Sequence, residues 1–320
     1  MDTLPVLPAH QLQRCAPEQR WLIEDLWGAD AVGTIGGEPK SCKSFLALAM
    51  AVAVASGRPC LDRFAPHRTG RVLLFAAEDA LHVVRERLEG LCAHAHLALP
   101  ELDLWLITAP SVRLDIETDR RRLTATVAAL QPVLLILDPF VRLHRVDENV
   151  SAAVVPLLAC LRQIQRRHGC AVALVHHARK GAAKVRPGQA LRGSSEFHAW
   201  SDSSLFLRRR GERLRLSVEH RAHPSPPDLD LALHVTPSSV ALVAVQSATA
   251  TDEPIPARPA ADRDRVLLAL ADSDHPLPIR DLRARCRIRT ATLCAILQDL
   301  QTDALVTKIN GGWQACQSPP

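Results

Sequence analysis

Residues 36–44 read Gly-Gly-Glu-Pro-Lys-Ser-Cys-Lys-Ser, so a lysine and a hydroxyl side chain close a glycine-containing loop. An apolar run at 31–35 precedes this loop and a helical pattern follows it. The pattern G-x-x-x-x-G-K-[ST] between a strand and a helix binds phosphates, because backbone N–H groups of the loop and of the helix N-terminus converge on them. We predict that Lys43 bridges the β- and γ-phosphates of a nucleotide and that Ser44 ligates Mg²⁺. The predicted contact residues are Gly37, Glu38, Pro39, Lys40, Ser41, Cys42, Lys43, Ser44 and Phe45.

Cys42 departs from this pattern, because it stands where the second glycine is expected. If the backbone there has a positive φ, a side chain costs roughly 1–2 kcal/mol. This residue therefore puts full activity in question, and both a redox role and a tolerated small substitute are open.

Two further apolar runs end in carboxylates. The run 133–137 ends at Asp138, and the run 71–76 is followed by Ala77-Glu78-Asp79. At the carboxyl edge of a buried strand Asp138 could hold Mg²⁺, and Glu78 on an adjacent strand could accept a proton from water that attacks the γ-phosphate. We expect Asp79 to cap the helix that follows.

A pair of histidines, His176 and His177, ends the apolar run 171–175. Polar side chains at this place could sense the γ-phosphate, with His177 the better placed of the two; capping of the strand end is the alternative.

These groups require a sheet that brings several strand ends to one edge. Apolar runs at 31–35, 71–76, 103–107, 133–137 and 171–175 alternate with helical patterns at 43–55, 80–93, 119–130 and 150–168. Such alternation predicts an α/β domain with a mostly parallel sheet. Later runs at 204–208, 214–219, 231–235 and 240–245 predict antiparallel strands that extend the sheet at one side.

The sequence divides into four parts. We expect a polar lead-in at 1–28, the ATPase domain at 29–245, a linker at 246–262 and a small domain at 263–320. The last part has helical spacing at 263–271, 279–286 and 290–300 and a hairpin near Gly311, which predicts a winged helix-turn-helix.

These motifs, in this order, resemble the RecA-like branch of P-loop ATPases, and among them the RepA-type hexameric helicases of mobilisable plasmids and, more distantly, DnaB-type replicative helicases. The resemblance covers roughly residues 20–245. Its carriers are GGEPKSCKS, FAAEDA, LLILDPF, LVHHARKG and LRGSSEFHAWSDSSLFL.

The resemblance implies a homo-oligomeric ring, expected to be a hexamer, with active sites between subunits. It also implies that Glu78 is the catalytic base and that the strand end at His176 and His177 couples nucleotide state to DNA. Arg221 corresponds to the arginine that a neighbouring subunit supplies, and a surface arginine at a strand end is the alternative. A second basic residue is common two positions earlier, where this chain has Glu219.

Two basic regions are candidates for DNA binding. In the resembling helicases the loop after the histidines faces the ring channel, so we expect single-stranded DNA at Arg179, Lys180, Lys184, Arg186 and Arg192. A solvated basic loop is the alternative. In the small domain, DNA or a protein partner is expected at Arg283, Arg285, Arg287 and Arg289.

Composition agrees with a cytoplasmic ATPase. The net charge is +5, which favours polyanion partners, and the nine cysteines form no C-x-x-C pair. The N-terminus has no signal-peptide pattern. The sequence predicts an ATP- and Mg²⁺-dependent motor on single-stranded DNA, of a plasmid or another mobile element. The rival hypothesis is a nucleotide-controlled oligomerisation switch.

Overall fold

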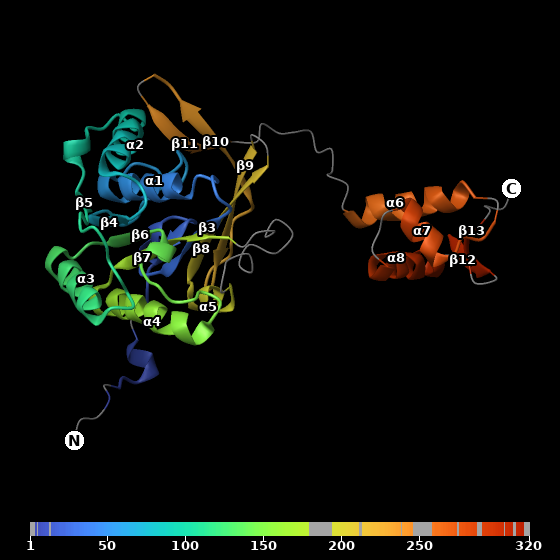
Figure 1. The fold of residues 1–320 in the computed structure, drawn as a ribbon, viewed down its shortest axis with the longest axis horizontal. Coiled ribbons are helices and arrows are strands. Elements are labelled where there is room, and N and C mark those ends of the chain that lie inside the picture. The colour runs from blue at the N-terminus through green and yellow to red at the C-terminus, as the bar shows by residue number, and fades with distance from the viewer. Residues whose placement is uncertain are drawn as a thin grey trace. The chain divides into compact units, whose positions relative to one another are not determined.

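The computed structural model describes residues 4, 6–12, 14–178, 194–210, 213–237, 239–245, 258–273, 275–286, 290–303, 305–309 and 312–316. The chain divides into two compact units, Met1–Gln246 and Ser247–Pro320, each with its own apolar core. Figure 1 shows the elements of each unit.

The described part of the first unit contains a nine-stranded sheet, in the order β11-β10-β9-β8-β3-β7-β6-β4-β5. The six strands from β8 to β5 are parallel, and β9, β10 and β11 run antiparallel to their neighbours. Their bounds are β3 Val32–Gly37, β4 Val72–Ala76, β5 Leu104–Leu106, β6 Leu134–Asp138, β7 Ala171–His177, β8 Ser203–Arg210, β9 Arg213–His220, β10 Leu229–Val235 and β11 Val240–Ala244.

Strand β8 is antiparallel to β9, as the sequence predicts, and joins the parallel part of the sheet on its other side. There β8 pairs parallel to β3, with Gly33 opposite Ser203 and Gly37 opposite Leu207, a pairing that the sequence analysis did not predict. The turn into β8 follows a short helix, α5 (Ser194–Trp200), that the sequence analysis did not predict. Strand β3 is therefore hydrogen-bonded to a parallel neighbour on each side, and the loop that follows it leaves the interior of the sheet.

Helices cover both faces of the sheet (Figure 1). One apolar cluster contains the buried residues of α1 (Lys43–Ser56) and α2 (Leu81–His94), and the other contains those of α3 (Glu117–Leu130), α4 (Ser151–His168) and α5. Successive residues of β6 alternate between the two clusters, as the pleat of a strand buried on both faces requires. The five predicted core strands and four predicted helices are thus present, with ends shifted by a few residues.

The expected boundary at residue 28 does not match the packing. Residues 21–28 include two short strands, β1 (Trp21–Ile23) and β2 (Trp27–Gly28), that pair with each other. Leu22, Leu26 and Trp27 are fully buried in the same core as α1. The end of the polar lead-in is therefore part of the first unit, because its three large apolar side chains complete that core.

The described residues of the second unit form three helices and a two-stranded antiparallel hairpin. Its helices pack around a core that includes Leu282, Leu293 and Trp313. The first helix begins at Arg258, inside the segment expected to be linker. The bounds are α6 Arg258–Ala271, α7 Ile279–Cys286, α8 Thr290–Thr302, β12 Val306–Ile309 and β13 Gly312–Ala315. Among the helices described in either unit, none has both the length and the apolar character needed to cross a membrane.

Candidate nucleotide site

The loop between β3 and α1 has a conformation that depends on Gly37. Its φ is +155°, and a Cβ there would lie 2.5 Å from the carbonyl oxygen of Leu207. After the turn, the Lys43 ammonium donates to the carbonyl of Glu38 at 2.8 Å, and the Ser41 hydroxyl donates to the same carbonyl at 2.8 Å. The loop thus holds its own lysine within the hollow where phosphates are expected.

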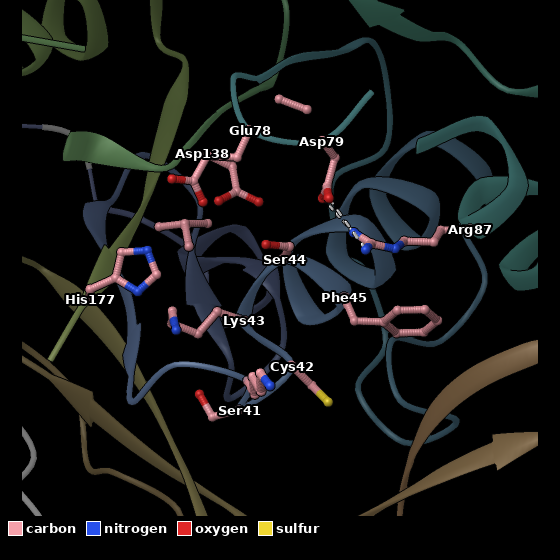
Figure 2. Close-up of a pocket in the computed structure, with 13 residues that line it drawn as sticks. Ser41, Cys42, Lys43, Ser44, Phe45, Glu78, Asp79, Arg87, Asp138 and His177 are labelled. Carbon is pink, nitrogen blue, oxygen red and sulfur yellow. Dashed lines mark hydrogen bonds and ion pairs between the residues drawn. The ribbon is translucent and has the colours of Figure 1, made fainter. Parts of the chain in front are cut away.

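Cys42 has the left-handed backbone that its position in the motif suggested. Its φ is 64° and its ψ 25°, and it directly precedes the first residue of α1. The guanidinium Nη2 of Arg209, from β8, donates to the Cys42 sulfur at 3.4 Å. In Figure 2 the thiol points away from Lys43 and Ser44, so the substitution for glycine leaves the hollow open.

Lys43 is largely removed from water, with 5% of its surface exposed. Burial lowers its pKa, while the negative charges of Asp138 and Glu78 act in the opposite direction. The Lys43 ammonium therefore lies near carboxylates and away from water, where its electrostatic attraction to a bound polyphosphate would be strong.

Asp138 ends β6 and is buried, with 9% of its surface exposed. The pKa of its carboxyl is raised to about 6, mainly by burial. The neighbouring carboxylates of Asp79 and Glu78 contribute to this rise, while a hydrogen bond with Ser44 and the charge of Lys43 act in the opposite direction. The carboxylate and the Ser44 hydroxyl are thus in direct contact, as a shared cation site would require.

These side chains line one pocket of about 450 Å³ at the carboxyl edge of the sheet. Figure 2 shows Lys43, Ser44, Glu78, Asp138 and His177 around the same hollow. His177 reaches it because β7 is in register with β3, which places His177 opposite Gly37. The remaining lining residues are Lys40, Ser41, Cys42, Phe45, Ala76, Asp79, Arg87 and Val175.

Glu78 follows β4 and forms an ion pair with Arg142, whose Nε lies 3.1 Å from Oε1 of the glutamate. Asp79 does not cap α2, contrary to the prediction from the sequence. The N-cap is Ala80, without a side-chain hydrogen bond, and the Asp79 carboxylate instead pairs with Arg87 at 2.5 Å. An arginine two helical turns beyond the cap thus draws the carboxylate away from the helix end.

His176 lies outside the pocket lining. It is 1% exposed and stacks on Phe197 of α5, with ring centroids 4.3 Å apart. Phe140, just after Asp138, contacts both rings edge-on. His176, on β7, thus packs against Phe140 after β6 and against α5, while the neighbouring His177 faces the pocket.

Arg221 lies far from the pocket of its own chain. It follows β9 beside Asp202, at the amino edge of the sheet, whereas the phosphate loop leaves the carboxyl edge. Its guanidinium lies 3.4 Å from the Asp202 carboxylate and donates to the carbonyl of Ala199. About five strand residues, or roughly 17 Å, separate the two edges.

The candidate DNA residues are only partly described. Arg179, Lys180, Lys184, Arg186 and Arg192 lie outside the described residues, as do Arg287 and Arg289. Arg283 and Arg285 are exposed on α7.

Three arginines of the site were not predicted: Arg87, Arg142 and Arg209. Each contacts a motif residue from another element. Arg87 could have been found from its place on α2, two helical turns after Asp79. The other two contacts depend on tertiary packing, for which the sequence pattern has no signal.

Comparison with known proteins agrees with this fold. A family profile described as an AAA domain matches residues 2–183. A DnaB-like replicative helicase, solved with its interactions with primase, superposes with a TM-score of 0.51 and 14% identity, covering 67% of this chain and 57% of the helicase chain. The RadB recombinase matches with a TM-score of 0.47 and 17% identity over 67% of this chain and 90% of that chain. The matched region thus spans little more than half of the helicase.

Proposed function

We propose that this chain hydrolyses ATP as an oligomeric motor on single-stranded DNA. The premise is that the chain belongs to the AAA domain family and is a RecA-like P-loop ATPase related to DnaB-type helicases. One observation carries the proposal. Lys43, Ser44, Asp138, Glu78 and His177 come from four separate segments of the chain and line one pocket.

Hydrolysis in this pocket needs a base and a cation. In the proposed reaction a water oxygen forms a bond to the γ-phosphorus while the bond to the β,γ-bridging oxygen breaks, releasing ADP and phosphate. Glu78 accepts the proton of the attacking water. Lys43 and the N–H groups at the start of α1 stabilise the negative charge on the transferred group. His177, which lines the same pocket, would contact the γ-phosphate.

The pocket residues fit a magnesium ion bound together with the nucleotide. The described residues contain no cluster of three or more His, Cys, Asp or Glu suited to a metal. Mg²⁺ does not require one, because it is commonly held by one or two protein ligands, phosphate oxygens and water. Ser44 and Asp138, already in contact, would hold it, and a cation there would offset the cost of a buried carboxylate. Bound Mg²⁺ would supply positive charge to the phosphates.

The motor needs a second subunit. Arg221 cannot serve its own pocket from the opposite edge of the sheet, so we propose that it acts on the ATP of a neighbour in a ring. If the Arg221 side chain moves away from Asp202, the Asp202 carboxylate stays paired, because Arg162 also contacts it at 2.5 Å. The basic residues between 179 and 192 would contact DNA phosphates. We propose a hexamer by analogy with the resembling helicases.

The second unit has the element order of a winged helix-turn-helix, α6-α7-α8 followed by the β12-β13 hairpin. Exposed Arg283 and Arg285 precede α8, where such domains grip DNA phosphates. We propose DNA binding here, with docking of a protein as the alternative. A mobile genetic element as the source rests on the resemblance to plasmid helicases.

A switch that controls oligomerisation remains the second candidate. It is favoured by the left-handed Cys42 in the loop and by Glu219 where the resembling family often has a basic residue. A switch requires only slow hydrolysis.

Mixing two inactive variants tests the motor. Arg221→Ala and Glu78→Gln chains should regain ATPase activity when combined, because a mixed ring contains interfaces with one intact half from each chain. Supplying such an arginine accelerates hydrolysis by about 10³–10⁵ in related systems. If wild-type protein is monomeric with MgATP and the mixture stays inactive, the ring motor is wrong.

DNA dependence separates the motor from the switch. Replacing Arg179, Lys180, Lys184 and Arg186 by Ala should flatten the salt dependence of single-strand affinity by about 0.7 for each DNA phosphate that the loop no longer neutralises. In a motor this variant also loses DNA-stimulated hydrolysis. In a switch, DNA binding survives it and disappears when the second unit is deleted.

A further inference from the structure

Glu78, the candidate base, is contacted by a residue of the segment that directly follows β6, the strand that ends at Asp138. Arg142 lies in the short 3-10 turn η4 (Phe140–Arg142) that follows β6. Its Nε donates to Oε1 of Glu78 at 3.1 Å, across 64 positions of sequence. One segment therefore carries Asp138 and, four residues later, Arg142, whose guanidinium contacts Glu78.

The backbone at Arg142 is firmly anchored. Phe140 and Leu143, on either side of the arginine, are completely buried. The N–H of Leu143 donates to the carbonyl of Phe140 at 2.8 Å, and the N–H of Leu114 donates to the carbonyl of Leu143 at 2.6 Å. The position from which the Arg142 side chain reaches out is thus set by the core.

A buried contact between a histidine and a glutamate lies next to this anchored turn. His144 and Glu148 lie 3.4 Å apart, and their side chains are 2% and 8% exposed. The His144 ring also packs on Phe140, with centroids 4.4 Å apart. The backbone after β6 is therefore held by the core, and the Arg142 side chain is the part of this turn that reaches Glu78.

We propose that Arg142 is a positioning residue that orients Glu78 for proton transfer, an inference that rests on the proposed ATP hydrolysis. The Glu78 side chain is 42% exposed, so without a partner it would exchange among several rotamers. Arg142 engages Oε1 and leaves Oε2 free to accept the proton of the attacking water. Arg142 touches no reacting atom in this role and acts through the glutamate.

The size of the effect follows from the exposure of the pair. The Arg142 side chain is 61% exposed. An exposed ion pair of this kind changes the population of the paired side-chain conformation by at most about fivefold. Arg142→Ala should therefore lower kcat about three- to fivefold. Its affinity for MgATP should remain that of wild type, because the arginine does not line the pocket.

The experiment compares single-turnover hydrolysis and fluorescent-nucleotide binding in full-length variants. Arg145→Ala is the matched control, because it removes an equal charge from an exposed side chain three residues away. This control should keep wild-type kcat. Arg142→Lys, which keeps the charge, should recover more than half of the decrease in rate. In a double-mutant cycle, Arg142→Ala should have no further effect in a Glu78→Gln background.

The outcomes that contradict the proposal have different meanings. If Glu78→Gln hydrolyses ATP at the wild-type rate, the base assignment of the proposed function falls, and the role of Arg142 with it. If Glu78→Gln is inactive but the Arg142 effect persists in its background, only the positioning role is overturned. The same holds if Arg142→Ala weakens nucleotide binding, raises kcat or behaves like Arg145→Ala.

Discussion

Replacement of Cys42 by glycine and by alanine measures the strain in the phosphate loop. Both variants remove the thiol and its contact with Arg209. Alanine keeps a Cβ on a backbone with φ of 64°, whereas glycine does not. The difference between the two variants therefore isolates the cost of the left-handed conformation from the removal of the thiol.

The expected difference is about 1 kcal/mol in favour of glycine. A Cβ in the left-handed region costs roughly 1–2 kcal/mol. The glycine variant loses about 0.4–1 kcal/mol of this gain in stability, because glycine gives the unfolded chain more conformations that folding must remove. For a unit of this size, 1 kcal/mol corresponds to a shift in Tm of about 2–4 °C.

Differential scanning calorimetry on the full chain provides the assay. The chain has two units, so the relevant transition is the one that MgATP moves to higher temperature. We expect Tm to be higher in Cys42→Gly than in Cys42→Ala, and hydrolysis in Cys42→Gly to equal or exceed that of wild type. An alanine variant as stable as the glycine variant would show that the loop stores no strain at this position.

Three other predictions concern the same pocket. Lys43→Ala should abolish ATP binding in a fluorescence titration, because it removes a buried ammonium that lies among carboxylates where the phosphates are expected; unchanged affinity would refute the phosphate assignment. Asp138→Asn should stabilise the nucleotide-free protein in EDTA by up to about 3 kcal/mol at pH 7. Because the folded-state pKa is raised from 3.8 to about 6, the wild type gains stability as pH falls through this window, so the advantage of the variant should vanish below it; a pH-independent difference would contradict this interpretation. A thiol alkylator should inactivate the wild-type ATPase unless MgATP is present and should spare Cys42→Gly; equal inactivation of that variant would implicate another cysteine.

The parallel core could be predicted because its signals are local. Each buried strand of the core is a short apolar run, and the polar residues that could do chemistry stand at its carboxyl end, as with Asp138 at the end of β6 and His177 at the end of β7. The parallel pairing of β8 with β3 could not be predicted in this way. An apolar strand looks alike in either direction, and the short helix α5 that returns the chain to the starting edge has no strong pattern.

Side-chain contacts between distant segments account for the other differences. Asp79 has the sequence position of a helix cap, but the choice between a backbone N–H and Arg87 is made by geometry. The contact of Arg142 with Glu78 depends on the pairing of β4 with β6. These strands are not consecutive in the sequence, so their adjacency is known only from the strand order of the folded sheet. Burial of Trp27 likewise depends on a core that residues 1–28 do not contain by themselves.

The separation of Arg221 from the phosphate loop restricts the symmetry of any assembly. The two half-sites lie at opposite edges of one sheet, and the strands β3, β8 and β9 between them hold that spacing. In a two-fold dimer every contact is made twice, so Arg221 could reach the partner's pocket only if both edges belonged to one self-complementary surface. If each interface holds only one of the two edges of a chain, the chain gives its arginine to one partner and receives an arginine from another. Such head-to-tail interfaces produce a closed ring or an open helical filament, the choice being set by the rotation between successive subunits.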